Sequence, residues 1–252
     1  MLHFRQEPMA FGSTRPNETK KGQARLAVND RWVDGMMFVM DLIIFDLDGT
    51  LVDSRLDIAA SVNEVLVNLG RPTLPNETIY GYVGSGVRCL IERSLGGGSS
   101  EYVDEALEMF LSVYRRHLLD TTRPYRGVRE ALAQLKRGRT FAILSNKPTQ
   151  ESNSVLEGLD LRDYFDYVHG GESFARRKPD PIGIRALMEK TGTDPEATLM
   201  VGDSRVDYET ARNASVKVCL VSYGIGAKEV EELDPDYLVD DLRELIPLVQ
   251  KS

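Results

Sequence analysis

The chain has few of the residues that mark redox or disulfide-stabilised proteins. It contains two cysteines, Cys89 and Cys219, and neither belongs to a CxxC pair. Isolated cysteines in apolar surroundings fit neither a disulfide framework nor a zinc motif, so we expect both to be buried, reduced thiols. The sequence therefore predicts a protein of a reducing compartment, the cytoplasm.

Long hydrophobic runs and positive charge are also scarce. No stretch approaches the roughly 18 apolar residues that a membrane helix requires. The net charge is −8 at pH 7, which disfavours a role that depends on neutralising many nucleic-acid phosphates. We therefore expect neither a membrane nor a nucleic acid as a partner, and any cations that bind an anion must be gathered locally.

Residues 1–39 lack the periodicity of the rest of the chain. They show no sustained helix or strand pattern and no apolar core of roughly 7–15 residues that would indicate a secretory signal. We expect this N-terminal extension to be disordered or loosely docked.

From residue 40 onward, short apolar runs alternate with amphipathic segments. The run "LIIFD" (42–46) is continuous and apolar, which is typical of a strand buried on both faces. Segments with helical spacing separate the candidate strands and predict a doubly wound parallel, Rossmann-like α/β sheet. The other candidate strands are 141–146, 167–171, 198–203, 217–224 and 236–241.

One segment, residues 54–125, interrupts this alternation. It contains three helical patterns and no convincing strand, and two of the patterns stop at Gly70 and Gly96, as helices often do. A structureless loop of this length is unusual in a compact domain. The sequence predicts an inserted α-helical cap (54–125) on an α/β catalytic core (40–53 and 126–252).

Polar side chains follow several of the candidate strands. In a parallel α/β sheet, ligand sites form beyond the carboxyl ends of the strands. Clustered carboxylates there favour a divalent cation with oxygen ligands, most naturally Mg²⁺. The residues concerned are Asp46 and Asp48 after the first strand, Ser145 and Asn146 after the second, Asp203 and Asp207 near the fourth, and Lys178 before a helix.

Four segments of the chain resemble a known family. "FDLDGTLVDS", "ILSNKP", "RKPDP" and "GDSRVDYETARNA" resemble, in that order, the four motifs of the haloacid dehalogenase superfamily of phosphohydrolases. The resemblance spans residues 41–250, and "VGSGVRCLIERSLG" in the insert looks like the cap of its phosphoglycolate phosphatases. One position departs from the pattern, because Ser215 stands where such enzymes often carry glycine.

The resemblance implies a Mg²⁺-dependent hydrolase of small phosphomonoesters, with 2-phosphoglycolate as the expected substrate. It implies that Asp46 is the nucleophile and forms an aspartyl-phosphate. Asp48 would protonate the leaving oxygen and then act as base toward water. Lys178 would supply a fixed positive charge at the phosphate, and Ser145 a hydroxyl donor.

The same resemblance suggests which residues contact the metal and the substrate. Asp46, the backbone carbonyl of Asp48, and Asp203 would hold Mg²⁺, while Asp207 would orient a water or Lys178 from behind. The carboxylate of the leaving group needs a cation or backbone donors near the cap, and Arg88 with the Gly84–Gly86 loop is the candidate. The remaining substrate contacts expected are Thr50 and Asn146.

Several alternatives use the same core. A phosphosugar mutase, a pyrophosphatase or a nucleotidase would differ mainly in cap contacts, which the sequence does not resolve. A dehalogenase is disfavoured because it needs no proton donor such as Asp48, and phosphonate cleavage because residues 54–125 contain no lysine. A non-catalytic binding module would predict a broken motif, yet all four are intact. Both a monomer and a homodimer remain open.

Overall fold

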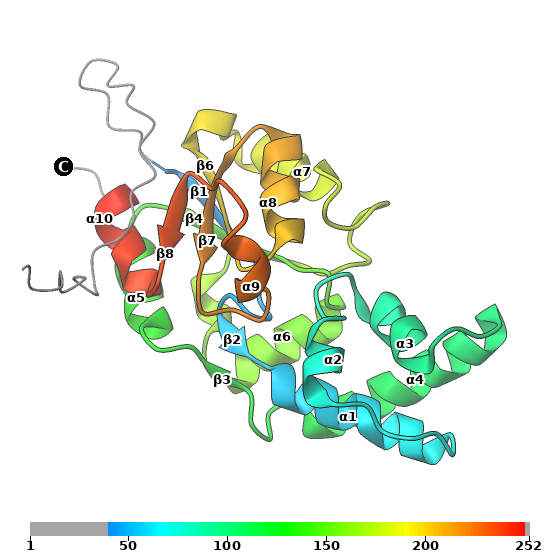
Figure 1. Ribbon diagram of the computed structural model, residues 1–252. Coiled ribbons are helices and arrows are strands. Elements are labelled where there is room, and N and C mark those ends of the chain that lie inside the picture. The colour runs from blue at the N-terminus through cyan, green and yellow to red at the C-terminus, as the bar shows by residue number, and fades with distance from the viewer. Residues whose placement is uncertain (1–39, 250–252) are drawn as a thin grey trace, which may run out of the picture.

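A six-stranded parallel sheet forms the centre of the protein (Figure 1). The computed structural model describes residues 40–249, so the extension predicted for residues 1–39 lies outside the described residues. The strand order is β5-β4-β1-β6-β7-β8. This confirms the Rossmann-like core expected from the sequence. The strands are β1 (Leu42–Phe45), β4 (Thr140–Leu144), β5 (Tyr167–His169), β6 (Thr198–Gly202), β7 (Lys217–Val221) and β8 (Tyr237–Val239).

Helices cover both faces of this sheet because each strand is apolar on both sides. Within β1, Ile43 and Phe45 pack into one hydrophobic cluster, whereas Leu42 and Ile44 pack into the other. The first cluster includes side chains of α5 (Val128–Leu135), α6 (Thr149–Gly158) and α10 (Leu245–Val249). The second includes side chains of α7 (Ile182–Thr191), α8 (Arg205–Ala214) and α9 (Ala227–Val230).

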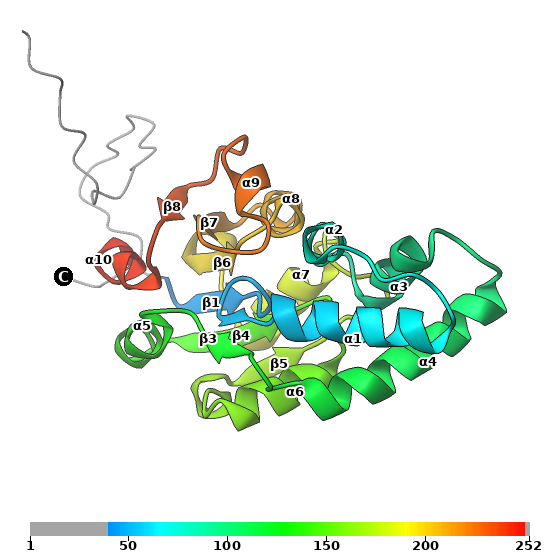
Figure 2. The ribbon, with the colours of Figure 1, turned by 60° about the horizontal axis from the view of Figure 1, so that its bottom comes forward.

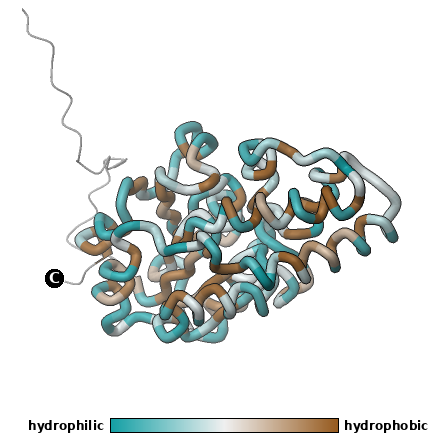
Figure 3. The backbone as a smooth tube through the Cα atoms, turned by 90° about the horizontal axis from the view of Figure 1, so that it is seen from below, coloured by the Kyte–Doolittle hydropathy of each residue, from teal (hydrophilic) through white to brown (hydrophobic). Residues whose placement is uncertain are grey.

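Residues between β1 and α5 form the helical insert, which lies to one side of the sheet (Figures 1 and 2). Both α1 and α3 contact α4, the longest helix of the insert, and hydrophobic residues recur along these helices (Figure 3). Gly70 and Gly96, predicted as helix ends, both have φ of +67°. The sequence did not predict α2. The insert helices are α1 (Arg55–Asn68), α2 (Asn76–Tyr80), α3 (Val87–Leu95) and α4 (Ser100–His117).

A small antiparallel pair joins the insert to the core. Strand β2 (Val52–Asp53) pairs with β3 (Arg123–Pro124), with Val52 opposite Pro124. The expectation of no strand in residues 54–125 is therefore wrong at the C-terminal end of that segment. Two-residue strands show no alternation that a sequence pattern could reveal. The chain thus leaves the core and returns to it at adjacent positions.

The C-terminal part of the core shows two local departures from the expected pattern. The segment after β8, whose sequence has helical spacing, is divided into a 3₁₀ turn, Leu242–Glu244, and α10. Ser215 ends α8 with φ of +60°, where glycine has no steric cost and another residue loses about 1 kcal/mol. Within residues 40–249, no helix combines the length and apolar character that crossing a membrane would demand. Two further 3₁₀ turns cover Arg162–Tyr164 and Pro195–Ala197.

Candidate active site

The strand order places the predicted polar residues at one edge of the sheet. Strand β1 lies between β4 and β6, so Asp46, Ser145 and Asp203, which follow these three strands, become neighbours. Lys178 reaches the same place from the loop before α7, and Asp207 from the first turn of α8. All five side chains are buried. The structure therefore brings together the residues that the sequence placed at strand ends.

A tight turn after β1 fits against Asp203. Gly49 has φ of +91°, and a Cβ atom added there would lie 2.2 Å from Asp203 Oδ2, so only glycine fits. The next hydroxyl, Thr50 Oγ1, donates a hydrogen bond to Asp203 Oδ1 at 3.2 Å. Thr50 is fully buried and does not line the pocket described below. Its hydroxyl thus holds a carboxylate, a different role from the substrate contact expected from the sequence.

Lys178 is a buried cation between two carboxylates. Its Nζ lies 2.9 Å from Asp46 Oδ1 and donates to Asp207 Oδ1 at 2.6 Å. Burial alone would lower the pKa of Lys178, but the Asp207 and Asp46 carboxylates outweigh it and hold that pKa above its usual value. Lys178 therefore remains charged at this edge of the sheet.

Asp207 is fully engaged by protein donors. Besides Lys178, it forms a capping box with Ser204 at the start of α8, in which Asp207 Oδ2 accepts from Ser204 N at 3.2 Å and Ser204 Oγ at 2.7 Å. The same oxygen also accepts from Asp203 N at 3.2 Å. These contacts suit a residue that positions Lys178 and the Asp203 backbone.

Three carboxylates form a cluster that fits a divalent cation. Asp46, Asp203 and Asp207 each place one oxygen within 4.8 Å of the others. Burial, followed by the charges of Asp207 and Asp46, raises the pKa of Asp203; burial also raises the pKa of Asp46, although Lys178 opposes this. Asp46 Oδ1 is buried without a hydrogen-bond partner of good geometry among the described residues. An added cation would relieve this excess of negative charge, and carboxylate oxygens suit Mg²⁺.

Asp48 is paired with a lysine that sequence analysis left without a role. Lys147 Nζ donates to Asp48 Oδ1 at 3.0 Å and Oδ2 at 3.1 Å, and Ser54 Oγ donates to Oδ1 at 2.6 Å. The Lys147 side chain is 5% exposed. Its Nζ also donates to the Tyr114 hydroxyl at 2.5 Å and lies 4.5 Å from the centre of that ring. The only sequence signal was its place in "ILSNKP", directly after Ser145 and Asn146.

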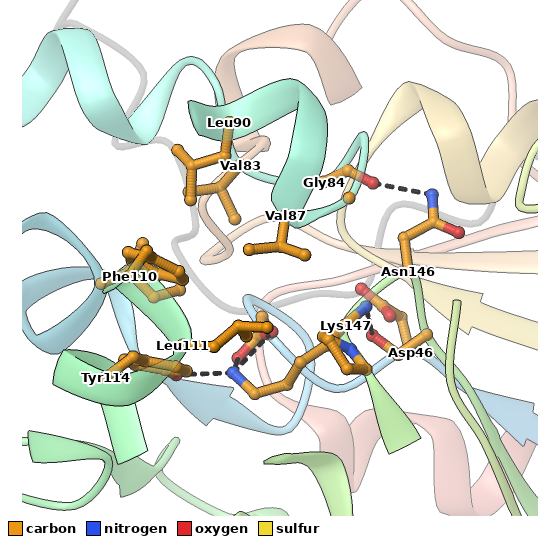
Figure 4. Close-up of a pocket in the computed structure, with 15 residues that line it drawn as sticks. Asp46, Val83, Gly84, Val87, Leu90, Phe110, Leu111, Tyr114, Asn146 and Lys147 are labelled. Carbon is orange, nitrogen blue, oxygen red and sulfur yellow. Dashed lines mark hydrogen bonds and ion pairs between the residues drawn. The ribbon is translucent and has the colours of Figure 1, made fainter. Parts of the chain in front are cut away.

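A pocket separates the strand ends from the insert (Figure 4). Its volume is about 60 Å³. Asn146 Nδ2 closes one side by donating to Gly84 O of the insert at 2.9 Å and to Lys178 O of the core at 3.0 Å. The core contributes Asp46, Asp48, Ser145, Asn146, Lys147 and Pro148, and the insert contributes Ile58, Val83, Gly84, Gly86, Val87, Leu90, Phe110, Leu111 and Tyr114.

Arg88 does not line this pocket, although Gly84 and Gly86 do. It lies on the outer surface of the insert, where its Nε donates to Glu92 Oε1 at 3.1 Å and its guanidinium also contacts Asp104. Residues four apart on a helix meet on its surface, and the Glu92 partner holds Arg88 there. The structure therefore separates Arg88 from the two glycines with which it was expected to act.

Comparison with protein families agrees with this geometry. A family model described as haloacid dehalogenase-like hydrolase matches residues 43–221. The chain belongs to this family.

Similarity to individual members extends over most of this hydrolase. It is 38% identical over 217 residues to a phosphoglycolate phosphatase of Nitrosospira multiformis, covering 83% of this chain and 96% of that protein. It is 37% identical over 211 residues to one of Agrobacterium fabrum, covering 82% and 91%. A crystal structure of a predicted phosphoglycolate phosphatase from Haemophilus somnus aligns with a TM-score of 0.81 and 30% identity, covering 86% of this chain and all of that one. The hydrolase is thus similar to phosphoglycolate phosphatases.

Proposed function

We propose that this hydrolase is a Mg²⁺-dependent phosphatase that converts 2-phosphoglycolate to glycolate and phosphate. The observation that carries the proposal is the pocket, into which the Asp46 and Asp48 carboxylates both open. Its volume of about 60 Å³ suits a small leaving group. Several curated relatives, which align with more than 80% of this chain, are named phosphoglycolate phosphatases.

In the first proposed step, a carboxylate oxygen of Asp46 attacks phosphorus. The bond between phosphorus and the glycolate oxygen breaks, and the phosphoryl group is left on Asp46 as an aspartyl-phosphate. Protonated Asp48 gives its proton to the departing ester oxygen, which becomes the hydroxyl group of glycolate. Ser54 and Lys147 hold the Asp48 carboxyl group in place.

In the second step, water replaces Asp46 on phosphorus. Asp48, now ionised, accepts a proton from that water, the bond between phosphorus and Asp46 breaks, and inorganic phosphate is released. Lys178 keeps a positive charge 2.9 Å from Asp46 throughout. Ser145, which lines the pocket, supplies a hydroxyl toward the phosphate oxygens.

Asp46 and Asp203, with the backbone carbonyl of Asp48, are the proposed holders of Mg²⁺. The ion would supply positive charge where a phosphate dianion meets a carboxylate. Asp207, whose oxygens are already occupied by Lys178, Ser204 and Asp203, would support this site without belonging to it.

The insert, residues 54–125, is proposed to act as a cap domain. Its apolar side chains cover the pocket, and a cap that closes over the core excludes water from the reacting groups. We further propose that the protein acts in the cytoplasm, because both cysteines, the buried Cys219 and Cys89, which is half-buried where a buried thiol was expected, are free thiols. Action as a monomer or homodimer without nucleic acid is also part of the proposal.

A phosphate-release screen tests the proposed substrate. With Mg²⁺, we expect kcat/KM for 2-phosphoglycolate to exceed that for glucose 1-phosphate, AMP and pyrophosphate by at least about 100-fold, because a small pocket penalises larger leaving groups. Conversion of glucose 1-phosphate to glucose 6-phosphate would instead indicate a mutase. A preference for AMP or pyrophosphate would replace the proposal with a nucleotidase or pyrophosphatase.

Metal removal tests the proposed cation site. EDTA should abolish phosphate release, and Mg²⁺ should restore it. Mg²⁺ at about 100 times its Kd should stabilise the folded protein by about 2.7 kcal/mol. For a chain of this size, that raises Tm by about 5–10 °C.

Two substitutions locate this cation. Asp203→Asn should remove the Mg²⁺-dependent rise in Tm, because it removes one of the proposed ligands. Asp163→Asn is the matched control, since Asp163 is exposed and precedes β5 at the opposite edge of the sheet. An undiminished rise in Asp203→Asn would show that the ion binds elsewhere.

A further inference from the structure

The pocket contains one cation, Lys147, which faces the largely apolar side chains of the insert. Among the described residues that line it, Lys147 is the single Lys, Arg or His side chain. Figure 4 shows its side chain extending toward Tyr114 beneath Val87, Phe110 and Leu111 of the insert. A ligand carboxylate transferred from water into such a pocket pays a large desolvation cost unless a cation meets it. Lys147 is the group positioned to do so.

Tyr114 supports the same reading. Its hydroxyl accepts a hydrogen bond from Lys147 Nζ, so the hydroxyl proton remains available for a second partner. No acceptor for that proton is found within residues 40–249. Stacking against Phe110, with ring centroids 5.4 Å apart, fixes the Tyr114 ring. An ammonium and a hydroxyl held side by side can together bind the two oxygens of one carboxylate.

The position of Lys147 also limits the length of the leaving group. Its Nζ lies 3.0 Å from Asp48 Oδ1, and Asp48 is the residue proposed to protonate the leaving oxygen. A group bound to Lys147 is therefore only a few atoms from that oxygen. Glycolate, in which one methylene separates the ester oxygen from the carboxylate carbon, meets this requirement.

Resting on the proposed phosphatase function, we propose that Lys147, assisted by Tyr114, selects substrates whose leaving group carries a carboxylate close to the ester oxygen. In this assignment, the insert supplies the hydroxyl and the core supplies the charge. The two groups together are therefore complementary to a short carboxylate-bearing leaving group. Arg88, on the outer surface, takes no part.

A pair of substrates that differ only in the carboxylate tests this assignment. 2-Phosphoglycolate and 2-hydroxyethyl phosphate have the same length, but the second carries a hydroxymethyl group in place of the carboxylate. The informative quantity is the ratio of their kcat/KM values. Lys147→Met should lower this ratio about 10- to 100-fold, the usual effect of losing a hydrogen bond to a charged group.

The ratio separates recognition from support of Asp48. If Lys147 acted only by holding Asp48, Lys147→Met would lower kcat/KM equally for both substrates, and their ratio would stay within about threefold of the wild-type ratio. That result would overturn the assignment. Lys190→Met is the matched control, because Lys190 is exposed but also lies 4.5 Å from a tyrosine ring, that of Tyr167. It should leave the ratio unchanged.

Tyr114→Phe keeps the ring and removes only the hydroxyl. This variant should lower the same kcat/KM ratio about 5- to 10-fold. If Lys147→Met does not fold, the ratio measured for Tyr114→Phe decides the assignment. An unchanged ratio in Tyr114→Phe would exclude Tyr114 from the subsite. A wild-type protein that releases phosphate but shows no preference for 2-phosphoglycolate would reject the proposed substrate itself.

Discussion

Asp46→Asn should abolish phosphate release from 2-phosphoglycolate, lowering kcat by at least about four orders of magnitude. The carboxamide has nearly the shape of the carboxylate but is a poor nucleophile toward phosphorus. Lys178 keeps its 2.6 Å hydrogen bond to Asp207 in the variant, so the buried cation is not left unpaired. The measurement is release of inorganic phosphate in the presence of Mg²⁺.

Asp53→Asn provides the matched control for this loss of charge. Asp53 lies on the same segment, but its side chain is 35% exposed and pairs with Arg55 at 2.7 Å. Exposed ion pairs contribute little to the stability of a protein, so the activity of Asp53→Asn should stay within about threefold of wild type. If Asp46→Asn kept more than a few per cent of the activity, another group would have to be the nucleophile.

Lys178→Met should impair both catalysis and folding. The charge lies 2.9 Å from Asp46 and 2.6 Å from Asp207, and its loss leaves buried carboxylates without a counter-charge. Breaking a buried pair in this way costs about 3–5 kcal/mol of the free energy of unfolding. Loss of the charge at the phosphate should lower kcat/KM by at least about 10³-fold. Urea unfolding without added metal and phosphate-release kinetics measure the two effects.

Lys136→Met is the comparison at the surface. Lys136 also pairs with a carboxylate, that of Asp166, but their side chains are 28% and 43% exposed. Its removal should cost less than about 1 kcal/mol and leave activity unchanged. A comparable loss of stability in both variants would show that burial of Lys178 is not what makes it important.

The sequence predicted the core well because its strands are buried on both faces. Continuous apolar runs such as Leu42–Phe45 are unambiguous in that setting, and the residue that follows each run is fixed at the sheet edge. Asp46, Ser145 and Asp203 therefore came together as expected. Their catalytic and metal-binding roles remain proposals, of which the substitutions of Asp46 and Asp203 test two.

Contacts between the insert and the core were harder to predict. Lys147 meets Tyr114 only because α4 lies over the end of β4, and no local pattern encodes how two packed units face each other. Arg88 was expected in the pocket, but a local signal against this was present in Glu92, four residues later on the same helix. Thr50 was expected at the substrate, and its hydrogen bond to Asp203 was not predicted because the two residues are distant in sequence.

The β2–β3 pair has a consequence for how the chain folds. Strand β1 must find β4 with the whole insert between them, and the entropic cost of closing such a loop rises with the logarithm of its length. Pairing Val52 with Pro124 would close the insert at its base, so that the connection left between β1 and β4 is much shorter and consists mainly of α5 and its flanking turns. An insert that folds early would thus accelerate assembly of the sheet, which makes the β2–β3 pairing, Val52 with Pro124 and Asp53 with Arg123, a candidate folding nucleus.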